Sequence, residues 1–379
     1  MKIDDKTSHN SPSLRFPEFT GEWEKCKIED ITDAVSSGKS KNHFSNGEYN
    51  LYGSTGIIGR TDKALYDGKL VLVARVGANA GFLQIINEPC GITDNTLILK
   101  PKGIDAFYLY YFLQHFNLNR LIFGSGQPLI TGGMLKKVKV SLGTISEQSK
   151  IVKFLSLLDE RTAVQSRLID RLQSLIKGIM VKLQQQGLSK GTWKRVPLSS
   201  ILKERTELNE GLLPVYSVSV SQGVVNQMEY LGRSFAAKDT SKYHVAHFGD
   251  LIYTKSPTGS FPYGIVKQNS NRYKVAVSPL YGVYTPANYF TGVFLQEYFK
   301  SEVNTFNYLH SLIQKGAKNT INITNQRFLD NYILIPTDSN DLQQISNLLL
   351  RLNAKKDLMQ NMLQQYQEQK QYLLRQMFI

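Results

Sequence analysis

Two stretches of the chain carry apolar side chains at alternating intervals of four and three residues. The first runs from about Ile145 to Gln186 and the second from about Ser339 to Phe378, and both are poor in glycine. When one stretch is shifted onto the other by 194 residues, their repeating positions coincide. A four–three alternation lines these positions along one face of a helix, as the seam of a coiled coil requires. The pattern therefore predicts two long helices.

The predicted seam has matching members in the two stretches: Ile151, Leu155, Leu158, Ile169, Leu172 and Ile176, and then Ile345, Leu349, Leu352, Met359, Leu363 and Tyr366. Both seams turn polar at the same place, at Thr162 and Gln165 in the first and at Lys356 in the second. A polar break in an apolar seam commonly fixes helix register. Each helix could instead lie on a core of its own, but the shared phase favours helices that pack on each other.

The segments before the two helices repeat more loosely. The only two tryptophans, Trp23 and Trp193, each stand before a short apolar stretch. Two pairs of runs align. The runs 68–73 and 249–254 both indicate a turn into a buried strand, and 94–99 corresponds to 278–283. An internal repeat of this length points to one module used twice.

These patterns predict an α+β fold in which two strand-rich domains alternate with two long helices. The expected divisions are an N-terminal tail at 1–16, a first domain at 17–144, a first helix at 145–187, a linker with a second domain at 188–338, and a second helix at 339–379. The linker is centred on the polar, glycine-containing run 184–191.

The charge balance indicates a polyanionic partner. The formal net charge is +14, with 24 basic and 18 acidic residues up to Leu188 and 21 basic and 13 acidic residues after it. Because the excess is spread over both halves, it fits two surfaces that each meet nucleic acid. Charge alone leaves open a basic surface without a partner.

Other composition features are less specific. The hydrophobic content of 41% is that of a folded protein, and no apolar run reaches the roughly 18 residues that span a bilayer. The polar N-terminus lacks the apolar core of a signal peptide, so we expect a cytoplasmic protein. Two cysteines, Cys26 and Cys90, are too few for a disulfide framework or a four-thiolate zinc site.

Four short patterns resemble catalytic or metal motifs and fail on their context. Gly38-Lys39-Ser40 lacks the preceding glycine of a phosphate-binding loop. The glycine-containing run 123–126 does not open a helix after a strand, as a methyl-donor site would. His244 and His247 have no third ligand nearby in the sequence. A Glu-x-Lys at 368–370 lacks the Pro-Asp pair of a nuclease. We therefore expect no active site and no metal site in this chain.

The order of motifs resembles the specificity subunits of type I restriction-modification systems. The segments that carry the resemblance are 14–19 with Trp23, Tyr52–Gly59, Ala74–Gly81, and Gly124–Ile130 followed by Glu147-Gln148 and Ile151. The second half departs from the pattern: 256–259 replaces 75–78, 315–319 replaces 124–127, and Asp341-Leu342 replaces Glu147-Gln148. The resemblance therefore implies two target-recognition domains that read different bases.

The resemblance implies that the two helices pair as an antiparallel coiled coil and hold the recognition domains apart on double-stranded DNA. The target would be bipartite and asymmetric. The chain itself would be non-catalytic and would bind no cofactor. Its partners would be two methyltransferase subunits that use S-adenosylmethionine, and restriction and translocase subunits that use ATP and magnesium.

Side chains for DNA contact are expected at loop positions rich in donors. Arginine suits guanine, asparagine and glutamine suit adenine, and lysine suits phosphates. The candidates are Lys39, Lys41, Ser54, Arg60, Arg75, Asn79 and Gln127 in the first domain, and Lys255, Ser256, Thr258, Ser260 and Tyr263 in the second.

Two other classes of function remain open at this point. One is a coiled-coil adaptor whose domains bind proteins, which the basic balance of both halves disfavours. The other is a stand-alone DNA-modifying enzyme, which the missing catalytic motifs disfavour.

Overall fold

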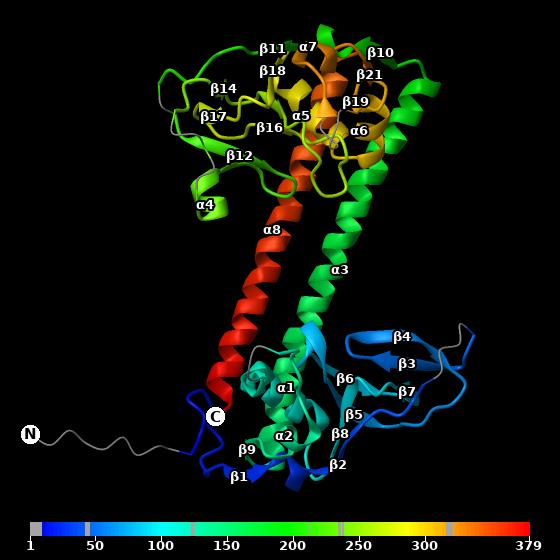
Figure 1. Cartoon of the computed structure of the whole chain (residues 1–379), viewed down its shortest axis with the longest axis vertical. Helices are drawn as coiled ribbons and strands as arrows, with labels where there is room; N and C mark the ends of the chain where they lie inside the picture. The colour runs from blue at the N-terminus through cyan, green and yellow to red at the C-terminus, as the bar shows by residue number, and fades with distance from the viewer. Residues whose placement is uncertain are drawn as a thin grey trace, which may run out of the picture. The chain divides into compact units, whose positions relative to one another are not determined.

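The computed structural model describes residues 10–41, 46–122, 126–211, 213–233, 236, 239–315 and 321–379. The chain divides into two compact units (Figure 1). The first unit contains residues 1–166 and 361–379, and the second contains 167–360. Each long helix contributes one part to each unit, so these boundaries follow packing, whereas the expected divisions follow secondary structure.

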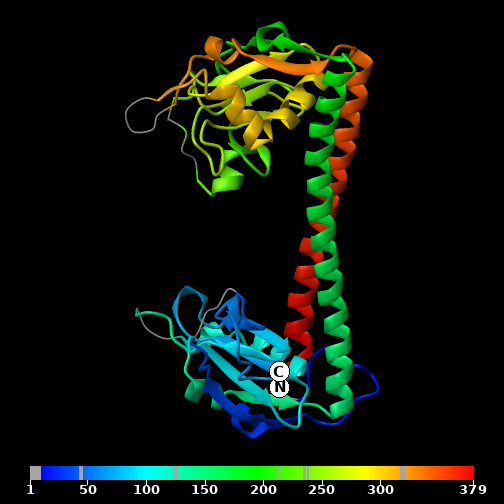
Figure 2. The same ribbon diagram turned by 90° about the vertical axis from the view of Figure 1, so that its right-hand side faces the viewer.

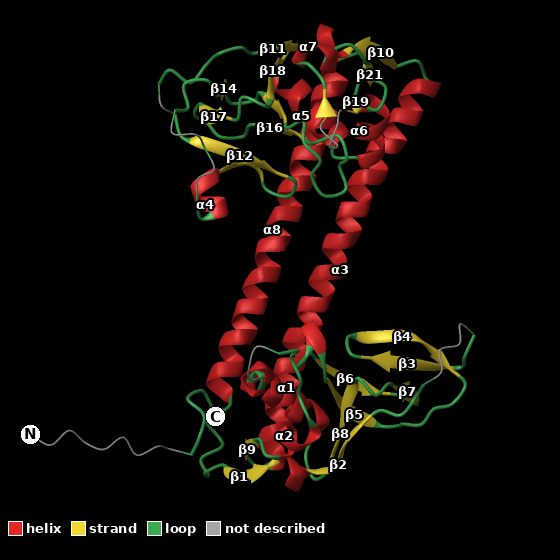
Figure 3. Ribbon diagram, viewed as in Figure 1, coloured by secondary structure: helices red, strands yellow, loops and turns green. Residues whose placement is uncertain are grey.

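The first unit is built on a four-stranded sheet, a three-stranded sheet and a two-stranded ribbon (Figure 3). Its strands are β1 (Glu24–Lys27), β2 (Thr32–Ser37), β3 (Tyr49–Gly53), β4 (Gly56–Thr61), β5 (Lys69–Ala74), β6 (Leu83–Asn87), β7 (Cys90–Ile92), β8 (Thr96–Pro101) and β9 (Lys139–Leu142). Its short helices are η1 (Ile28–Ile31), η2 (Gly77–Asn79), α1 (Ala106–Phe116), η3 (Leu118–Leu121) and α2 (Gly132–Lys136). The sheet orders are β2-β8-β5-β6, β4-β3-β7 and β1-β9.

The second unit repeats this plan. Its strands are β10 (Trp193–Pro197), β11 (Leu202–Glu204), β12 (Val215–Ser219), β13 (Gly223–Asn226), β14 (His244–Ala246), β15 (Leu251–Tyr253), β16 (Val266–Gln268), β17 (Val275–Val277), β18 (Gly282–Pro286), β19 (Gln314–Lys315), β20 (Ile321–Asn322) and β21 (Tyr332–Pro336). Its short helices are η4 (Leu198–Ser200), α4 (Gln227–Leu231), α5 (Tyr289–Phe299), α6 (Glu302–Leu309) and α7 (Asn325–Phe328). The sheet order β11-β18-β15-β16 matches that of the first unit, and β10 pairs with β21 as β1 pairs with β9.

The two units also share an unusual detail of pairing. In the first unit β3 pairs in parallel with β7, and in the second β12 pairs in parallel with β17, within otherwise antiparallel sheets. Trp23 and Trp193 are both buried, immediately before or at the start of the first strand of their unit. The α+β fold class with an internal repeat, predicted from the sequence, is therefore confirmed.

The structure corrects both aligned pairs of runs by a single residue. In the pair 94–99 with 278–283, Leu99 faces the core that includes α1, whereas it is Tyr284, and not Val283, that faces the core that includes α5. Val71 and Val73 of β5 face the core that includes α1, whereas Leu72 faces the smaller sheet. In β15, Leu251 and Tyr253 face the core that includes α5, and Ile252 faces the other way. Residue 71 is thus equivalent to 251, an offset of 180, where the sequence alignment used 181. Because a slip of one residue reverses every side chain in a strand, this changes which loop residues correspond.

The long helices α3 (Ile145–Ser189) and α8 (Ser339–Met377) pack on each other within each unit (Figure 2). In the first unit Ile151 and Leu155, near the start of α3, share a core with Leu373 and Leu374, near the end of α8. In the second unit Ile176 of α3 shares a core with Leu349 of α8. The start of each helix therefore meets the end of the other, which is antiparallel pairing.

The expected seam residues differ in how far they are buried. Ile151, Leu155, Ile169, Ile176 and Leu349 are buried, while Leu158, Leu172, Ile345, Leu352, Met359, Leu363 and Tyr366 are half-buried. Of the polar positions, Thr162 donates from Oγ1 to the Leu158 carbonyl at 2.8 Å and Lys356 is half-buried. Lys370, four residues after Tyr366, is a further polar position of the seam. It forms an ion pair with Asp159 of α3 at 2.5 Å.

A segment before β1 joins the ends of both long helices in the first unit. Arg15 donates from Nε and Nη2 to the two carboxylate oxygens of Glu147, at 2.6 and 2.8 Å. Trp23 donates from Nε1 to the same carboxylate at 3.1 Å. Glu147 lies in the first turn of α3 and is fully buried, and Leu14 donates its backbone N–H to the carbonyl of Gln376 in α8. The segment thus fixes the start of α3 beside the end of α8.

The end of α8 also contacts a half-buried histidine, which predicts a pH effect. The rings of Phe378 and Phe112 lie 5.8 and 6.3 Å from that of His115, and His115 Nδ1 is buried with no hydrogen-bond partner among the described residues. Burial, with a smaller effect of Arg120, lowers the pKa of His115 below its ordinary 6.5. The folded state therefore binds this proton less readily than the unfolded state, and stability should fall as pH drops below about 6.5. We expect the melting temperature of the first unit to fall between pH 7.5 and pH 5, and less so in H115Q. An equal fall in both proteins would contradict this.

Candidate nucleic-acid interface

In the first unit the structure brings Ser54 and Arg75 together. Arg75 directly follows β5, and its backbone N–H donates to the carbonyl of Asn95 at 2.9 Å. Ser54, in the turn between β3 and β4, donates from Oγ to the same carbonyl at 3.2 Å. The Arg75 carbonyl in turn accepts from the N–H of Ile130 at 2.8 Å. Both candidates are therefore held by backbone contacts between separate loops.

The Arg75 guanidinium itself is weakly satisfied. Its Nη1 lies 3.4 Å from Ser37 Oγ, and its Nε is buried without a hydrogen-bond partner among the described residues. No carboxylate within the described parts of the chain forms an ion pair with it. An arginine has five N–H donors in a planar fork, so several of these donors are available to a ligand.

Asn79 and Gln127 lie on loops that touch each other. Asn79 ends η2, and Gly77 of this turn donates its N–H to the carbonyl of Pro128, next to Gln127, at 3.0 Å. Both candidate side chains are exposed. The neighbouring residues Phe123 to Ser125 lie outside the described residues, as do Gly316 to Asn319 in the second half. The loops of Arg75, Asn79 and Gln127 thus meet at one place.

The remaining candidates of the first unit have different surroundings. Lys39 and Lys41 are exposed in the segment that follows β2. Arg60 donates from Nε to the carbonyl of Gly47 at 2.6 Å and from Nη2 to that of Glu48 at 2.7 Å. Its guanidinium therefore closes a loop of its own unit, a role that needs no DNA.

All five candidates of the second unit lie in one loop between β15 and β16. Lys255 has a backbone φ of 52°, and a Cβ on Gly264 would meet its nitrogen at 3.0 Å. The N–H groups of Thr258 and Phe261 each donate to the other's carbonyl at 3.0 Å, which closes the tip of the loop. This geometry makes the loop compact, because only glycine at 264 allows the two ends to approach so closely.

The polar side chains of this loop are partly engaged. Thr258 donates from Oγ1 to the carbonyl of Ser256 at 3.1 Å, and Ser260 donates from Oγ to Glu302 at 2.5 Å. The Tyr263 ring stacks on Phe306 with the centroids 5.5 Å apart. Ser256 is exposed, and Lys255 is half-buried.

A network of charges that sequence reasoning missed lies elsewhere in the second unit. Arg205 pairs with the buried carboxylate of Asp250 at 2.6 Å. Glu207 accepts from Lys274 at 2.9 Å and lies 2.5 Å from Nε2 of His247, and the Lys274 ammonium, with His247, holds the pKa of Glu207 below its ordinary range. These residues are scattered along the sequence and have no recognisable spacing. Their cations are neutralised internally, so part of the basic excess is not available to DNA.

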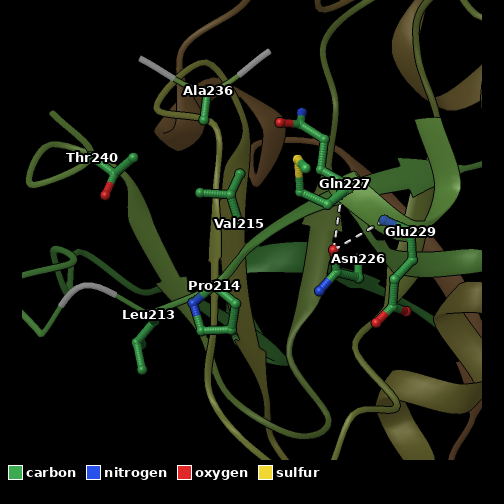
Figure 4. A pocket seen from close by; sticks show the side chains of 9 residues that line it. Leu213, Pro214, Val215, Asn226, Gln227, Glu229, Ala236 and Thr240 are labelled. Carbon is green, nitrogen blue, oxygen red and sulfur yellow. Dashed lines mark hydrogen bonds between the residues drawn. The ribbon is translucent and has the colours of Figure 1, made fainter. Parts of the chain in front are cut away.

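A pocket in the second unit also has unsuitable chemistry for a phosphate backbone (Figure 4). Asn226 accepts the N–H groups of Met228 and Glu229 at the start of α4 and so faces its own helix. The residues that line the pocket are Leu213, Pro214, Val215, Asn226, Gln227, Met228, Glu229, Ala236 and Thr240. They include one carboxylate and no basic side chain. Among the described residues, no group of three or more His, Cys, Asp or Glu is placed to hold a metal ion, and no helix is long and apolar enough to cross a membrane.

Part of the chain matches a known domain family. Residues 20–174 match the model of the type I restriction modification DNA specificity domain. Similar curated proteins are type I specificity subunits: EcoprrI of Escherichia coli, 28% identical over 115 residues, and MjaVIII of Methanocaldococcus jannaschii, 28% identical over 168 residues. The resemblance to type I specificity subunits is confirmed. The aligned segments cover 30% and 41% of this chain, and 29% and 39% of these two relatives.

Solved structures support the fold over nearly the whole chain. The S subunit of a type I restriction-modification system from M. genitalium superposes with a TM-score of 0.67 at 16% identity, over 97% of this chain and 99% of that one. A chain from a structure describing complex assembly and conformational transition of the type I R-M system superposes with a TM-score of 0.50 at 12% identity, over 94% and 97%. The two-domain, two-helix architecture is therefore that of S subunits. No comparison assigns a residue to DNA, and the individual candidates remain predictions.

Proposed function

We propose that this chain is the DNA-reading subunit of a type I restriction-modification complex and that it recognises a bipartite, asymmetric target. The observation that carries the proposal is a repeated frame with two different loops. The sheet order, the strand pairing and the long helices repeat between the units, whereas the segments after β5 and β15 differ in sequence and conformation. A constant frame with two different readers suits two unlike half-sites, each read by one domain.

The long helices also expose apolar side chains that partner subunits could cover. Six large apolar side chains that are exposed each come one residue before a seam position. They therefore lie beside the seam and not in it. On α3 these are Leu157, Val164, Leu168 and Leu175, exposed by 56%, 38%, 43% and 53%, and on α8 Leu348 and Leu358, exposed by 43% and 61%. Val164 and Leu358 are equivalent in the repeat. Exposed apolar positions of this kind mark surfaces that bind other proteins.

The duplicated frame of sheets and long helices favours two copies of one partner. Two methyltransferase subunits fit that requirement, and restriction and translocase subunits would join them. S-adenosylmethionine, ATP and magnesium would then be bound by the partners. The chain itself would supply DNA contacts and a scaffold, so the purified chain should neither methylate nor cleave DNA.

Duplex binding at two salt concentrations tests the proposal. The chain, co-purified with a type I methyltransferase subunit, should bind duplex DNA, and its affinity should fall roughly a thousandfold between 50 and 200 mM salt as phosphate contacts are screened. Fluorescence anisotropy with a labelled duplex measures this directly. A coiled-coil adaptor would bind no duplex at 50 mM salt, and that result would contradict the proposal. Methyl transfer by the chain alone would favour a stand-alone enzyme.

A further inference from the structure

The one-residue correction of strand register makes Arg75 and Lys255 equivalent. With residue 71 equivalent to 251, the offset of 180 carries Arg75 onto Lys255. The backbone hydrogen bonds support this equivalence. Ala74 donates its N–H to the carbonyl of Phe82 at 2.8 Å, and Thr254 donates its N–H to the carbonyl of Ile265 at 3.1 Å. Each acceptor lies just before the next strand of its sheet. Both units therefore place a cation at the point where the chain leaves the central strand β5 or β15.

Neither cation forms an ion pair with a carboxylate among the described residues. Arg75 is half-buried, its Nε has no hydrogen-bond partner, and its one side-chain hydrogen bond, to Ser37, is long at 3.4 Å. Thr96 Oγ1, on the strand that pairs with β5, is also buried and has no hydrogen-bond partner within the described parts of the chain. The surroundings of Arg75 are thus polar and incompletely satisfied.

Lys255 is in a comparable state. Its side chain is half-buried, and burial lowers the pKa of its ammonium despite the opposing effect of Glu204. The Glu204 carboxylate forms no ion pair with Lys255 and accepts instead from Asn325 Nδ2 at 2.6 Å. The backbone of Lys255 is in the left-handed region, at φ 52°, which is uncommon for a residue with a side chain and is found often at functional sites.

A partly desolvated cation that forms no ion pair is unfavourable in the free protein. A bound ligand that supplies a hydrogen-bond acceptor removes this cost. Resting on the proposed function, we infer that Arg75 and Lys255 are the equivalent specificity-determining residues of the two half-sites, each donating to a guanine in the major groove. Guanine presents O6 and N7 as adjacent acceptors, and arginine and lysine are its usual protein partners.

The positions favour a base edge over a phosphate. Both residues lie just after a central strand and are half-buried, whereas Lys39 and Lys41 are exposed. The Arg75 backbone is hydrogen-bonded to Asn95 and Ile130, and Lys255 follows Thr254, whose N–H donates to Ile265, so both residues start from positioned backbone. Phosphate contacts tolerate mobile side chains, whereas a base contact needs a fixed donor. The difference between a planar fork in one domain and a point charge in the other also fits half-sites of different sequence.

Methylation motifs and 7-deazaguanine duplexes test the inference with the whole complex. The methylated motif of the wild-type complex is read first, and each guanine of one half-site is then replaced singly by 7-deazaguanine, which lacks the N7 acceptor. R75M should lower affinity for the intact site roughly tenfold to a hundredfold. It should also abolish the further loss that one 7-deazaguanine causes in the wild type. R75K should retain part of the affinity, and K255M should act only on the other half-site.

R161M is the matched control, because Arg161 lies on α3 outside the candidate loops, with its guanidinium 5.0 Å from the centroid of the Tyr366 ring of α8. It should leave the motif and the effect of 7-deazaguanine unchanged, and thermal melts should show all variants folded. A half-site without a G·C pair, or R75M with wild-type affinity and motif, would overturn the inference while the proposed function stands. If the wild-type complex binds and methylates no bipartite motif, the proposed function fails, and the inference fails with it.

Discussion

Replacing Arg15 with methionine is expected to lower the free energy of unfolding of the first unit by about 3–5 kcal/mol. The arginine neutralises Glu147, a fully buried carboxylate in the first turn of α3, through two hydrogen bonds of 2.6 and 2.8 Å. In R15M the carboxylate keeps only the hydrogen bond from Trp23. A buried charge without its partner is strongly destabilising, because the desolvation of the charge is no longer offset.

Hydrogen exchange of segments 139–160 and 361–379 measures this effect locally. K150M is the matched control, since Lys150 contacts Glu18 of the same N-terminal segment through a pair whose side chains are 46% and 45% exposed. An exposed pair of this kind contributes under about 1 kcal/mol. The double variant R15M/E147L should recover part of the loss, because it removes the buried charge as well. Equal protection in R15M and K150M would show that the buried pair does not anchor the helix.

Truncating one seam residue is expected to release both long helices in the second unit. Leu349 is fully buried in the core that holds Ile176 and Met180 of α3, and L349A should lower the free energy of unfolding by about 2–5 kcal/mol through the lost contacts and the cavity left behind. The adjacent Leu348 is 43% exposed, so L348A makes the same chemical change on the solvent side of the same helix turn.

The control separates seam packing from helix propensity. L348A should shift stability by no more than about 0.5–1 kcal/mol. Hydrogen exchange should rise in L349A both at 339–355 of α8 and at 169–183 of α3, because the two helices pack on each other. If only the α8 segment lost protection, each helix would be supported by a core of its own, which is the alternative that the sequence left open.

The sequence predicted the long helices well because their signal is periodic. The four–three spacing places ten positions of each helix on the seam. One mismatched residue therefore does not change which face of the helix the pattern predicts to be apolar. The strands gave a weaker signal. Residues 70–74 of β5 and 251–253 of β15 are buried on both faces, so no alternation of polar and apolar positions shows which residue faces which core. The alignment of these strands was therefore wrong by one residue, and with it the correspondence of Arg75.

The candidate interface could be predicted in outline only. The segments that carry Ser54, Arg75, Asn79 and Gln127 were chosen by residue type and motif order, and the structure brings them into contacting loops. Sequence could not show that Arg60 is engaged by backbone carbonyls, because hydrogen bonding to a loop leaves no pattern along the chain. It also missed the contact of Arg15 with Glu147, which are separated by 132 positions.

The central claim is that each domain reads one half of a bipartite DNA target. Exchanging residues 192–338 for the second domain of another type I specificity subunit, followed by methylome sequencing of cells that carry the whole complex, tests this claim most directly. The account predicts an asymmetric bipartite motif for the wild type, and for the hybrid a motif in which one half is replaced and the other half is unchanged. A contiguous wild-type motif, or a hybrid in which both halves change, would contradict it.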